Sequence, residues 1–191
     1  MLKSNKIIVV SGVSGSGKTT LVTYLLSRKE LNLEFSISAC SRPKRPSEID
    51  GKDYIFLSNS EFQNKIRRDE FLEWEEVYTN HFYGTLKASS ESILNSGMNI
   101  LFDVDVKGAL SIKEYFKKRA RTIYIQPPSI SVAKKRLIER ETESKKDLNS
   151  RIKKMKQEAI YGAQMDCQVL NDDLDLAKDT IYNYVKEFLP K

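Results

Sequence analysis

A short glycine-rich segment near the start of the chain has the residue types and spacing of a phosphate-binding loop. Residues 12–19 read Gly-Val-Ser-Gly-Ser-Gly-Lys-Thr, which satisfies the pattern G-x-x-x-x-G-K-[ST]. Glycines let such a loop curl so that its N–H groups face inward, and the N-terminus of the next helix adds a positive dipole end. Lys18 would reach the β- and γ-phosphates, and the Thr19 hydroxyl would bind Mg²⁺. The segment therefore predicts a nucleoside triphosphate site.

The sequence on either side of the loop supplies the elements that must position it. Ile7-Ile8-Val9-Val10 is an apolar run suited to a buried strand, and residues 20–26 suit a helix. A glycine-rich turn that matches the pattern by chance would not require this context. The strand before the loop and the helix after it therefore favour the functional interpretation.

Further strands and helices are expected to alternate along the rest of the chain. Strands are expected at 34–38, 54–57, 71–77, 99–104, 122–125 and 169–170. Helices are expected at 61–68 with Ser60 as N-cap, and at 89–95, 108–116, 131–139, 148–164 and 174–188. Strands separated by helices predict an α/β fold: a parallel sheet of the P-loop NTP hydrolase type with helices on both faces.

Two polar inserts interrupt this alternation. They span about 35–88 and 139–150. A phosphate loop combined with two such excursions suggests a kinase that closes over its substrates, because water must be kept from the transferable phosphoryl group.

The charge of the chain limits the classes of partner. The 191 residues carry a net charge of +6, with a pI near 9.1, which fits a protein that handles polyanions without saying which. Basic runs such as Lys117-Lys118-Arg119 are short, and acidic residues surround most of them. We interpret these runs as solvated helix faces and expect no nucleic-acid partner.

Cysteine, histidine and apolar content exclude other classes. Cys40 and Cys167 lack metal-site spacing and are expected to be reduced. His81 is the only histidine, which rules out a His-based metal site and leaves a Ser-His-Asp triad only if His81 itself serves. The apolar runs are too short to span a bilayer and the start of the chain lacks the shape of a signal peptide, so we expect a cytoplasmic protein without a membrane partner.

Several more motifs follow the loop in a fixed order. They read Ser38-Ala39-Cys40-Ser41-Arg42-Pro43-Lys44-Arg45-Pro46, Glu48-Ile49-Asp50-Gly51-Lys52-Asp53-Tyr54, Phe71-Leu72-Glu73-Trp74, Phe82-Tyr83-Gly84-Thr85, Phe102-Asp103-Val104-Asp105, Arg136-Leu137-Ile138-Glu139-Arg140 and Val169-Leu170-Asn171-Asp172-Asp173. From Ile7 to about Phe188 the chain resembles guanylate kinase, the family that phosphorylates GMP from ATP. The resemblance implies one domain, with a core at 1–34, 89–138 and 151–191, a GMP-binding subdomain at 35–88 and a mobile lid at 139–150.

The residues of the GMP side make chemical sense. A dianionic phosphate suits two arginines with fork geometry, and Arg42 and Arg45 stand on a proline-flanked loop. Guanine displays N1–H and N2–H₂ donors that one carboxylate can accept, and Glu73 is the matching family position. Asp103 and Asp105 are two residues apart and are expected on one face at the strand end. The resemblance adds Tyr54 and Tyr83 for the phosphate, the hydroxyls of Ser38 and Thr85 for the base, and Asp105 on the GMP side.

The ATP side and the catalytic charges complete the expected site. The ATP-binding set is Gly12, Val13, Ser14, Gly15, Ser16, Gly17, Lys18, Thr19, Thr20, Arg136 and Asn171. The catalytic set is Lys18, Arg42, Asp103, Arg136, Arg140 and Arg151. Arginines in a dry site stabilise charge on the transferring phosphoryl oxygens. The Mg²⁺ cofactor is expected on Thr19, and the resemblance implies a second contact to it, through water, from Asp103. The resemblance also implies that Asn171 lies near the adenine; from its position at a strand end, Asn171 is alternatively the cap of a helix that starts at Asp172 or Asp173.

Three positions depart from the family pattern. Thr85 stands where the family often has serine, which keeps the hydroxyl. Lys107 replaces a common glutamine, and Glu141 replaces the glycine that usually follows the second lid arginine. Any donor role at position 107 and the lid geometry at position 141 stay open.

Two other functions remain as alternatives. A guanylate-kinase-like module without catalysis would bind phosphopeptides in the monophosphate site, although such modules typically have a degraded phosphate loop and Lys18 and Thr19 are intact here. A kinase for another nucleoside monophosphate is disfavoured by Glu73 together with Ser38 and Thr85. The sequence leaves monomer and homo-oligomer equally open.

Overall fold

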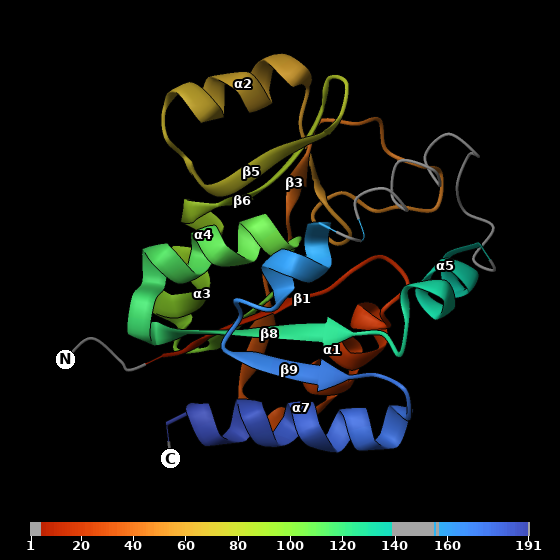
Figure 1. Ribbon diagram of the computed structural model, residues 1–191. Helices are drawn as coiled ribbons and strands as arrows, with labels where there is room; N and C mark the ends of the chain where they lie inside the picture. Colours follow the sequence, from red (N-terminus) through yellow and green to blue (C-terminus); the bar gives the residue numbers. More distant parts are fainter. Residues whose placement is uncertain (1–4, 139–154, 156, 191) are drawn as a thin grey trace.

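Two sheets, a larger one below a smaller one in the view of Figure 1, organise the molecule. The computed structural model describes residues 5–138, 155 and 157–190. The larger sheet contains five strands in the order β2-β7-β1-β8-β9. These strands are β1 (Ile7–Ser11), β2 (Leu33–Phe35), β7 (Asn99–Asp103), β8 (Ala120–Gln126) and β9 (Cys167–Leu170), and every neighbouring pair is parallel. The predicted parallel sheet is confirmed.

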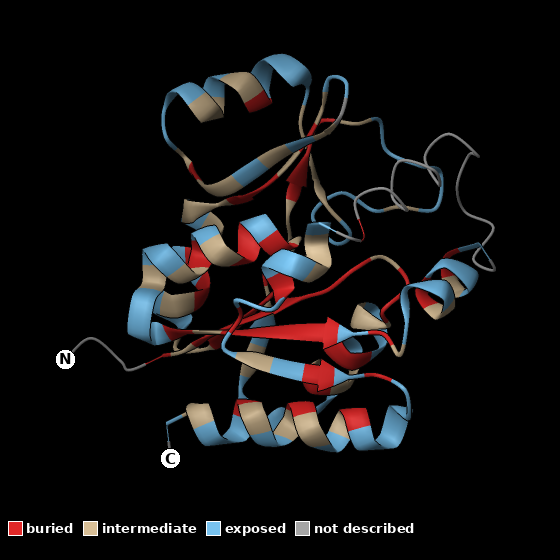
Figure 2. Ribbon diagram, viewed as in Figure 1, coloured by how far each residue is buried: buried red, intermediate tan, exposed pale blue. Residues whose placement is uncertain are grey.

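Helices cover both faces of this sheet, as predicted. They are α1 (Lys18–Ser27), α3 (Lys87–Ser96), α4 (Val106–Phe116), α5 (Ile130–Ile138) and α7 (Leu174–Phe188). Side chains alternate across β1: Ile7 and Val9 pack with α4 and α5, whereas Ile8 and Val10 pack with α1 and α7. Figure 2 shows the resulting buried layer through the centre of the sheet. A strand that is buried on both faces explains the continuous apolar run in β1.

The smaller sheet carries a third, aromatic core. Its order is β4-β3-β6-β5, formed by β3 (Ala39–Cys40), β4 (Ile55–Phe56), β5 (Phe71–Tyr78) and β6 (His81–Leu86). The helix α2 (Asn59–Arg67) covers it with Phe62, whose ring stacks on Phe71 at 4.4 Å between centroids and on Phe82 at 5.6 Å. Stacked rings bury a large apolar area. The smaller sheet and α2 are therefore stabilised by a hydrophobic core separate from those of the larger sheet.

Three local expectations are corrected by the structure. The expected strand 34–38 is wrong, because β2 ends at Phe35 and the chain then crosses to β3 in the other sheet. The expected cap Ser60 is also wrong: the Ser58 hydroxyl accepts from the Glu61 N–H, while the Glu61 carboxylate accepts from the Ser58 N–H. This reciprocal pair is a capping box. β6 lies where the apolar pattern predicts no strand.

Two short 3₁₀ turns and one partly described helix complete the chain. The turns are η1 (Lys29–Leu31) and η2 (Lys117–Arg119), and residues 157–162 are helical. Most of the expected helix 148–164 and the whole expected lid, 139–150, lie outside the described residues. Within the part of the chain that is described, no helix is long and apolar enough to cross a membrane.

Candidate active site

The glycine-rich loop connects β1 to α1, where the sequence places it. Gly15 and Gly17 have left-handed backbones, with φ of 79° and 90°. A Cβ at Gly15 would lie 2.2 Å from the Ala133 carbonyl oxygen, so both the conformation and the packing require glycine. The Lys18 ammonium donates to the Gly12 carbonyl at 2.6 Å, which folds this side chain back over the loop. A bound phosphate would offer Lys18 a charged acceptor in place of that carbonyl.

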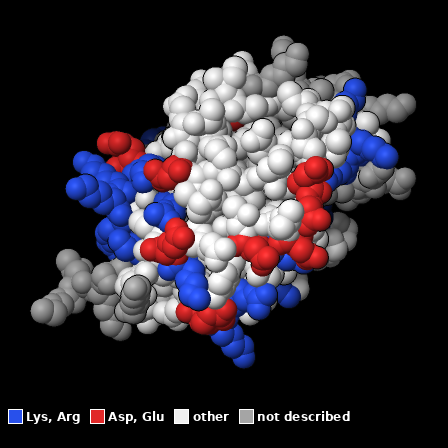
Figure 3. Space-filling model, turned by 60° about the horizontal axis from the view of Figure 1, so that its bottom comes forward, with Lys and Arg blue, Asp and Glu red and all other residues white. Residues whose placement is uncertain are grey.

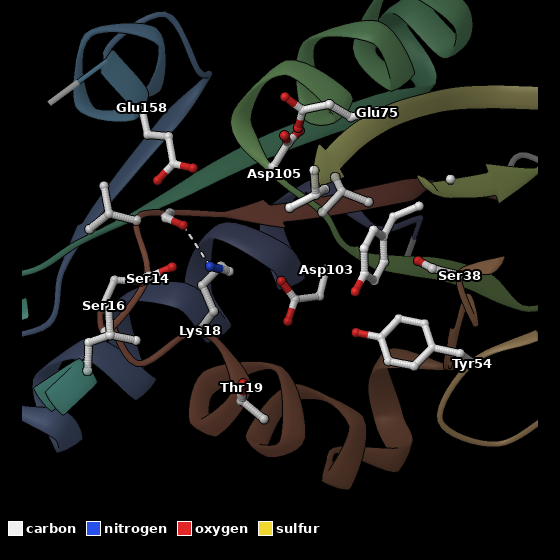
Figure 4. A pocket seen from close by; sticks show the side chains of 18 of the residues that line it. Ser14, Ser16, Lys18, Thr19, Ser38, Tyr54, Glu75, Asp103, Asp105 and Glu158 are labelled. Carbon is white, nitrogen blue, oxygen red and sulfur yellow. Dashed lines mark hydrogen bonds between the residues drawn. The ribbon is translucent and has the colours of Figure 1, made fainter. Parts of the chain in front are cut away.

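A pocket of about 400 Å³ extends from this loop to the smaller sheet. In Figure 4 the side chains of Lys18 and Asp103 point into it, with Tyr54 on the far side. Predicted residues that line it are Gly12, Val13, Ser14, Gly15, Ser16, Gly17, Lys18, Thr19, Ser38, Arg42, Arg45, Tyr54, Glu73, Tyr83, Asp103 and Asp105. The fold therefore brings residues between positions 12 and 105, far apart in the sequence, to one cavity.

All three guanidinium nitrogens of Arg42 donate hydrogen bonds. Its Nε donates to the Tyr83 hydroxyl at 3.0 Å, and Nη1 and Nη2 donate to the two carboxylate oxygens of Glu48 at 2.7 and 2.5 Å. The Tyr54 ring lies 5.1 Å from its guanidinium carbon. Arg42 lowers the pKa of Glu48 to about 2 through these hydrogen bonds, so the pair stays ionised near neutral pH. Glu48 also accepts from the Arg45 N–H at 2.8 Å and so links both arginines.

Glu73 sits in an acidic corner of the pocket. The Thr85 hydroxyl, fully buried, donates to Glu73 Oε1 at 2.6 Å. Burial raises the pKa of Glu73 to about 7, with smaller contributions from the negative charges of Asp105 and Glu75. Among the described residues no cation forms an ion pair with Glu73, and its carboxylate lines the cavity with further acceptor capacity. A ligand with two adjacent N–H donors would satisfy it.

The two aspartates reach the pocket by different routes. Asp103 is the last residue of β7, whereas Asp105 is the N-cap of α4 and accepts from the Gly108 N–H at 2.7 Å. The expectation that both end the strand is therefore wrong for Asp105, although both line the pocket. Burial raises the pKa of Asp103, and the charge of Lys18 opposes that shift.

A profile comparison decides the family of the chain. The family model for guanylate kinase matches residues 4–191. The chain belongs to the guanylate kinase family.

Individual guanylate kinases agree with the profile over nearly their whole length. The guanylate kinase of Bacteroides fragilis is 50% identical over 184 residues, which cover 96% of this chain and 90% of that protein. The guanylate kinase of Porphyromonas gingivalis is 45% identical, with 97% and 99% covered. The crystal structure of guanylate kinase from Anaplasma phagocytophilum matches with a TM-score of 0.76 at 27% identity, covering 100% of this chain and 89% of that one.

Some site residues expected from the guanylate kinase pattern do not line the pocket. Thr20 is exposed on α1, and Thr85 lies behind Glu73. Arg136 lies on α5 and donates to the Asn171 carbonyl at 3.3 Å. Asn171 is not a helix cap, because Asp173 caps α7 by accepting from the N–H groups of Asp175 and Leu176. Arg140, Arg151 and the departure at Glu141 lie outside the described residues.

The guanylate kinase pocket also has residues that the sequence argument missed. Glu48 was not predicted as a site residue, because no sequence motif marks a carboxylate beside a phosphate site. Glu75 and Val77 line the cavity together with Glu73. The period of two along β5 is a signal that could have found them. Glu158, from the helical segment 157–162, also lines the cavity.

The surface charge agrees with the expectation of solvated charged faces. On the face shown in Figure 3, basic and acidic side chains are interspersed around a broad area without either.

Proposed function

We propose that this chain transfers the γ-phosphoryl group of ATP to GMP, giving ADP and GDP. The observation that carries the proposal is one pocket whose two ends suit two different phosphates. The phosphate loop with Lys18 forms one end, and Arg42, Arg45 and the tyrosines form the other. Family membership supports the same pair of substrates.

The triphosphate of ATP would lie on the phosphate loop. The N–H groups at the start of α1 and the Lys18 ammonium supply positive charge there. Thr19 and Asp103 offer hydroxyl and carboxylate oxygens to the same cavity, the ligand type that Mg²⁺ prefers. Bound there, Mg²⁺ would neutralise charge on the β- and γ-phosphates.

GMP would lie across the smaller sheet. Arg42, Arg45, Tyr54 and Tyr83 would bind its phosphate. The Ser38 carbonyl accepts from the Ile55 N–H at 2.9 Å. In Figure 4 the Ser38 side chain lies near Tyr54, so its hydroxyl would be close to the phosphate. Glu73 would accept the N1–H and N2–H₂ donors of guanine while Thr85 orients it.

Transfer then needs alignment more than proton chemistry. A phosphate oxygen of GMP attacks the γ-phosphorus of ATP in line, and the bond from that phosphorus to the β–γ bridging oxygen breaks. The attacking oxygen is already anionic, so no general base is required. Lys18, Arg42 and the arginines at 136, 140 and 151 would stabilise the charge on the transferring oxygens. We also assign residues 35–88 to GMP binding and 139–150 to a closing lid.

Replacement of Lys18 tests the proposal. Lys18→Met keeps the length of the side chain without its charge. We expect turnover to fall by about 10²–10³-fold with the melting temperature kept, the usual effect of deleting one electrostatic contact to the transition state. Lys29→Met, at an exposed position of η1, is the matched control and should retain wild-type turnover. Unchanged turnover in Lys18→Met would refute the assignment of the loop.

The non-catalytic alternative is addressed by the same assay. A phosphopeptide-binding module would show no ADP formation in the wild-type chain, and Lys18→Met would then change nothing. The presence of Lys18 and Thr19 at the cavity favours the kinase.

A further inference from the structure

Asn171 directly follows the edge strand β9, and its side chain contacts the phosphate loop. Its N–H donates to the Gln126 carbonyl at 2.8 Å, which fixes its backbone to the end of β8. Only 5% of the residue is exposed. A buried amide side chain requires hydrogen-bond partners, and the cap of α7 is already supplied by Asp173. The side chain of Asn171 is therefore available to the loop.

The amide of Asn171 binds the phosphate loop itself. Its Nδ2 donates to the Ser16 carbonyl oxygen at 2.7 Å, a buried bond between residues far apart in the chain. A Cβ at Gly17 would lie 2.1 Å from the same Nδ2. A side chain at position 17 would therefore displace the Asn171 amide from this position.

This bond fixes the direction of a donor in the pocket. Ser16 and Gly17 share one planar trans peptide, in which the C=O and the N–H point in opposite directions. Because Asn171 holds the Ser16 oxygen, the Gly17 N–H points away from Asn171, and Gly17 is one of the residues that line the cavity. The N–H groups at a helix N-terminus are the donors that bind phosphate.

Asn171 also contacts a second part of the site through its backbone. Its carbonyl accepts from Arg136 Nη1 at 3.3 Å. One residue at the end of β9 therefore contacts both the phosphate loop and an arginine of α5. Neither contact involves a nucleotide base.

We propose that Asn171 is a positioning residue for the phosphate loop, which acts on the triphosphate of the donor whatever its base. This inference rests on the proposed function, because it takes the loop as the triphosphate site. It differs from the expectation that Asn171 contacts adenine.

Binding of ATP and of inorganic tripolyphosphate, which has no base, separates the two roles. Asn171→Ala removes the donor, and Asn171→Leu removes it while keeping a similar volume. Without its partner the Ser16 carbonyl is free to rotate, and we expect the Kd values of ATP and tripolyphosphate to rise by the same factor, about tenfold. The Kd of GMP should stay within about twofold, since the GMP side does not touch Asn171. Asn183→Ala, exposed on α7, is the matched control and should change none of these constants.

Each other outcome decides against the inference. Weaker ATP binding with unchanged tripolyphosphate binding would make Asn171 an adenine contact only. Equal losses for ATP, tripolyphosphate and GMP, with a lower melting temperature, would make its role purely structural. Unchanged binding of both donors in either variant would remove any role. A wild-type chain that binds neither donor would instead overturn the proposed function, so the two failures are distinguishable.

Discussion

At the scale of single residues, the chemistry of the pocket depends on how carboxylates and arginines are paired. Arg42 has a carboxylate partner in Glu48, whereas Glu73 accepts from the Thr85 hydroxyl and lies near two acidic residues, Asp105 and Glu75. The first arrangement holds a cation in place for an anionic ligand. The second leaves a buried acceptor that a ligand with paired donors would satisfy.

The ionisation of Glu73 predicts how GMP binding depends on pH. Burial raises the pKa of Glu73 from 4.5 to about 7, so the folded protein holds this proton more tightly than the unfolded chain does. The resulting contribution to folding stability is fully present below pH 4.5 and is lost as the pH rises through about 7. Guanine binding depends on pH in the opposite direction, since only the ionised carboxylate of Glu73 accepts both the N1–H and the N2–H₂ donors of the base. We expect the KM for GMP to fall as the pH rises from about 6 to about 8.

Glu73→Gln supplies the control for this prediction. The GMP phosphate itself ionises near pH ~6, so the difference between the two proteins is the quantity to measure. The variant should lose the Glu73 part of the pH dependence and raise the KM for GMP by about ten- to a hundredfold with the KM for ATP unchanged. Equal losses for both substrates would assign Glu73 a structural role.

Glu48 gives a second prediction at this scale. Its two oxygens hold both Nη atoms of Arg42 and the Arg45 N–H. The amide in Glu48→Gln has one acceptor oxygen, so both arginines should become less ordered. We expect the KM for GMP to rise by about five- to tenfold in steady-state assays. Glu34→Gln, exposed on β2, controls for the lost charge. A lower KM for GMP would mean that Glu48 competes with the phosphate for Arg42.

At the scale of elements, the start of α4 shapes the acidic corner. Gly108 is buried in the first turn of this helix, and its N–H is bound to Asp105. A Cβ there would lie 2.9 Å from Glu73 Oε2 and 3.2 Å from Asp105 Oδ1. The missing side chain therefore leaves room for the carboxylate that would receive guanine.

Gly108→Ala separates helix stability from guanine binding. Alanine is the better helix former by about 1 kcal/mol, so the melting temperature should stay the same or rise. The added methyl displaces the Glu73 carboxylate, and we expect the KM for GMP to rise by about tenfold with the KM for ATP unchanged. Ser111→Ala, exposed on α4, tests helix propensity alone. An unaltered KM for GMP in Gly108→Ala would show that Glu73 shifts without cost.

Most elements could be predicted from the sequence because their patterns are local. The helix at 174–188 has the predicted bounds, and β1 with its loop follows from one motif. The small sheet was predicted in part: the expected strands 54–57 and 71–77 correspond to β4 and β5. Its other strands, β3 and β6, were not predicted, and β3 is too short for a period of two to be read. The sequence pattern S-x-x-E at Ser58–Glu61 indicates the capping box, but Ser60 was predicted as the N-cap instead. The Asn171–Ser16 contact joins residues far apart in the chain, and the Arg42–Glu48 pair lies in an irregular loop, so no periodic sequence pattern marks either contact.

At the scale of the whole molecule, the proposed function assigns one substrate to each of the two sheets. The triphosphate end of the pocket is built on the carboxyl edge of the larger sheet, where ligands of parallel α/β folds bind. The monophosphate end comes mainly from the smaller sheet, which has its own aromatic core.

The most direct test of this account measures ADP formation from MgATP with GMP, AMP, CMP and UMP in turn. A site that hydrogen-bonds guanine through Glu73 should reject the other bases, and we expect turnover with GMP at least about a hundredfold above each of them. Comparable turnover with AMP would contradict the role of Glu73. Absence of turnover with all four, in folded protein that binds ATP, would contradict the kinase assignment itself.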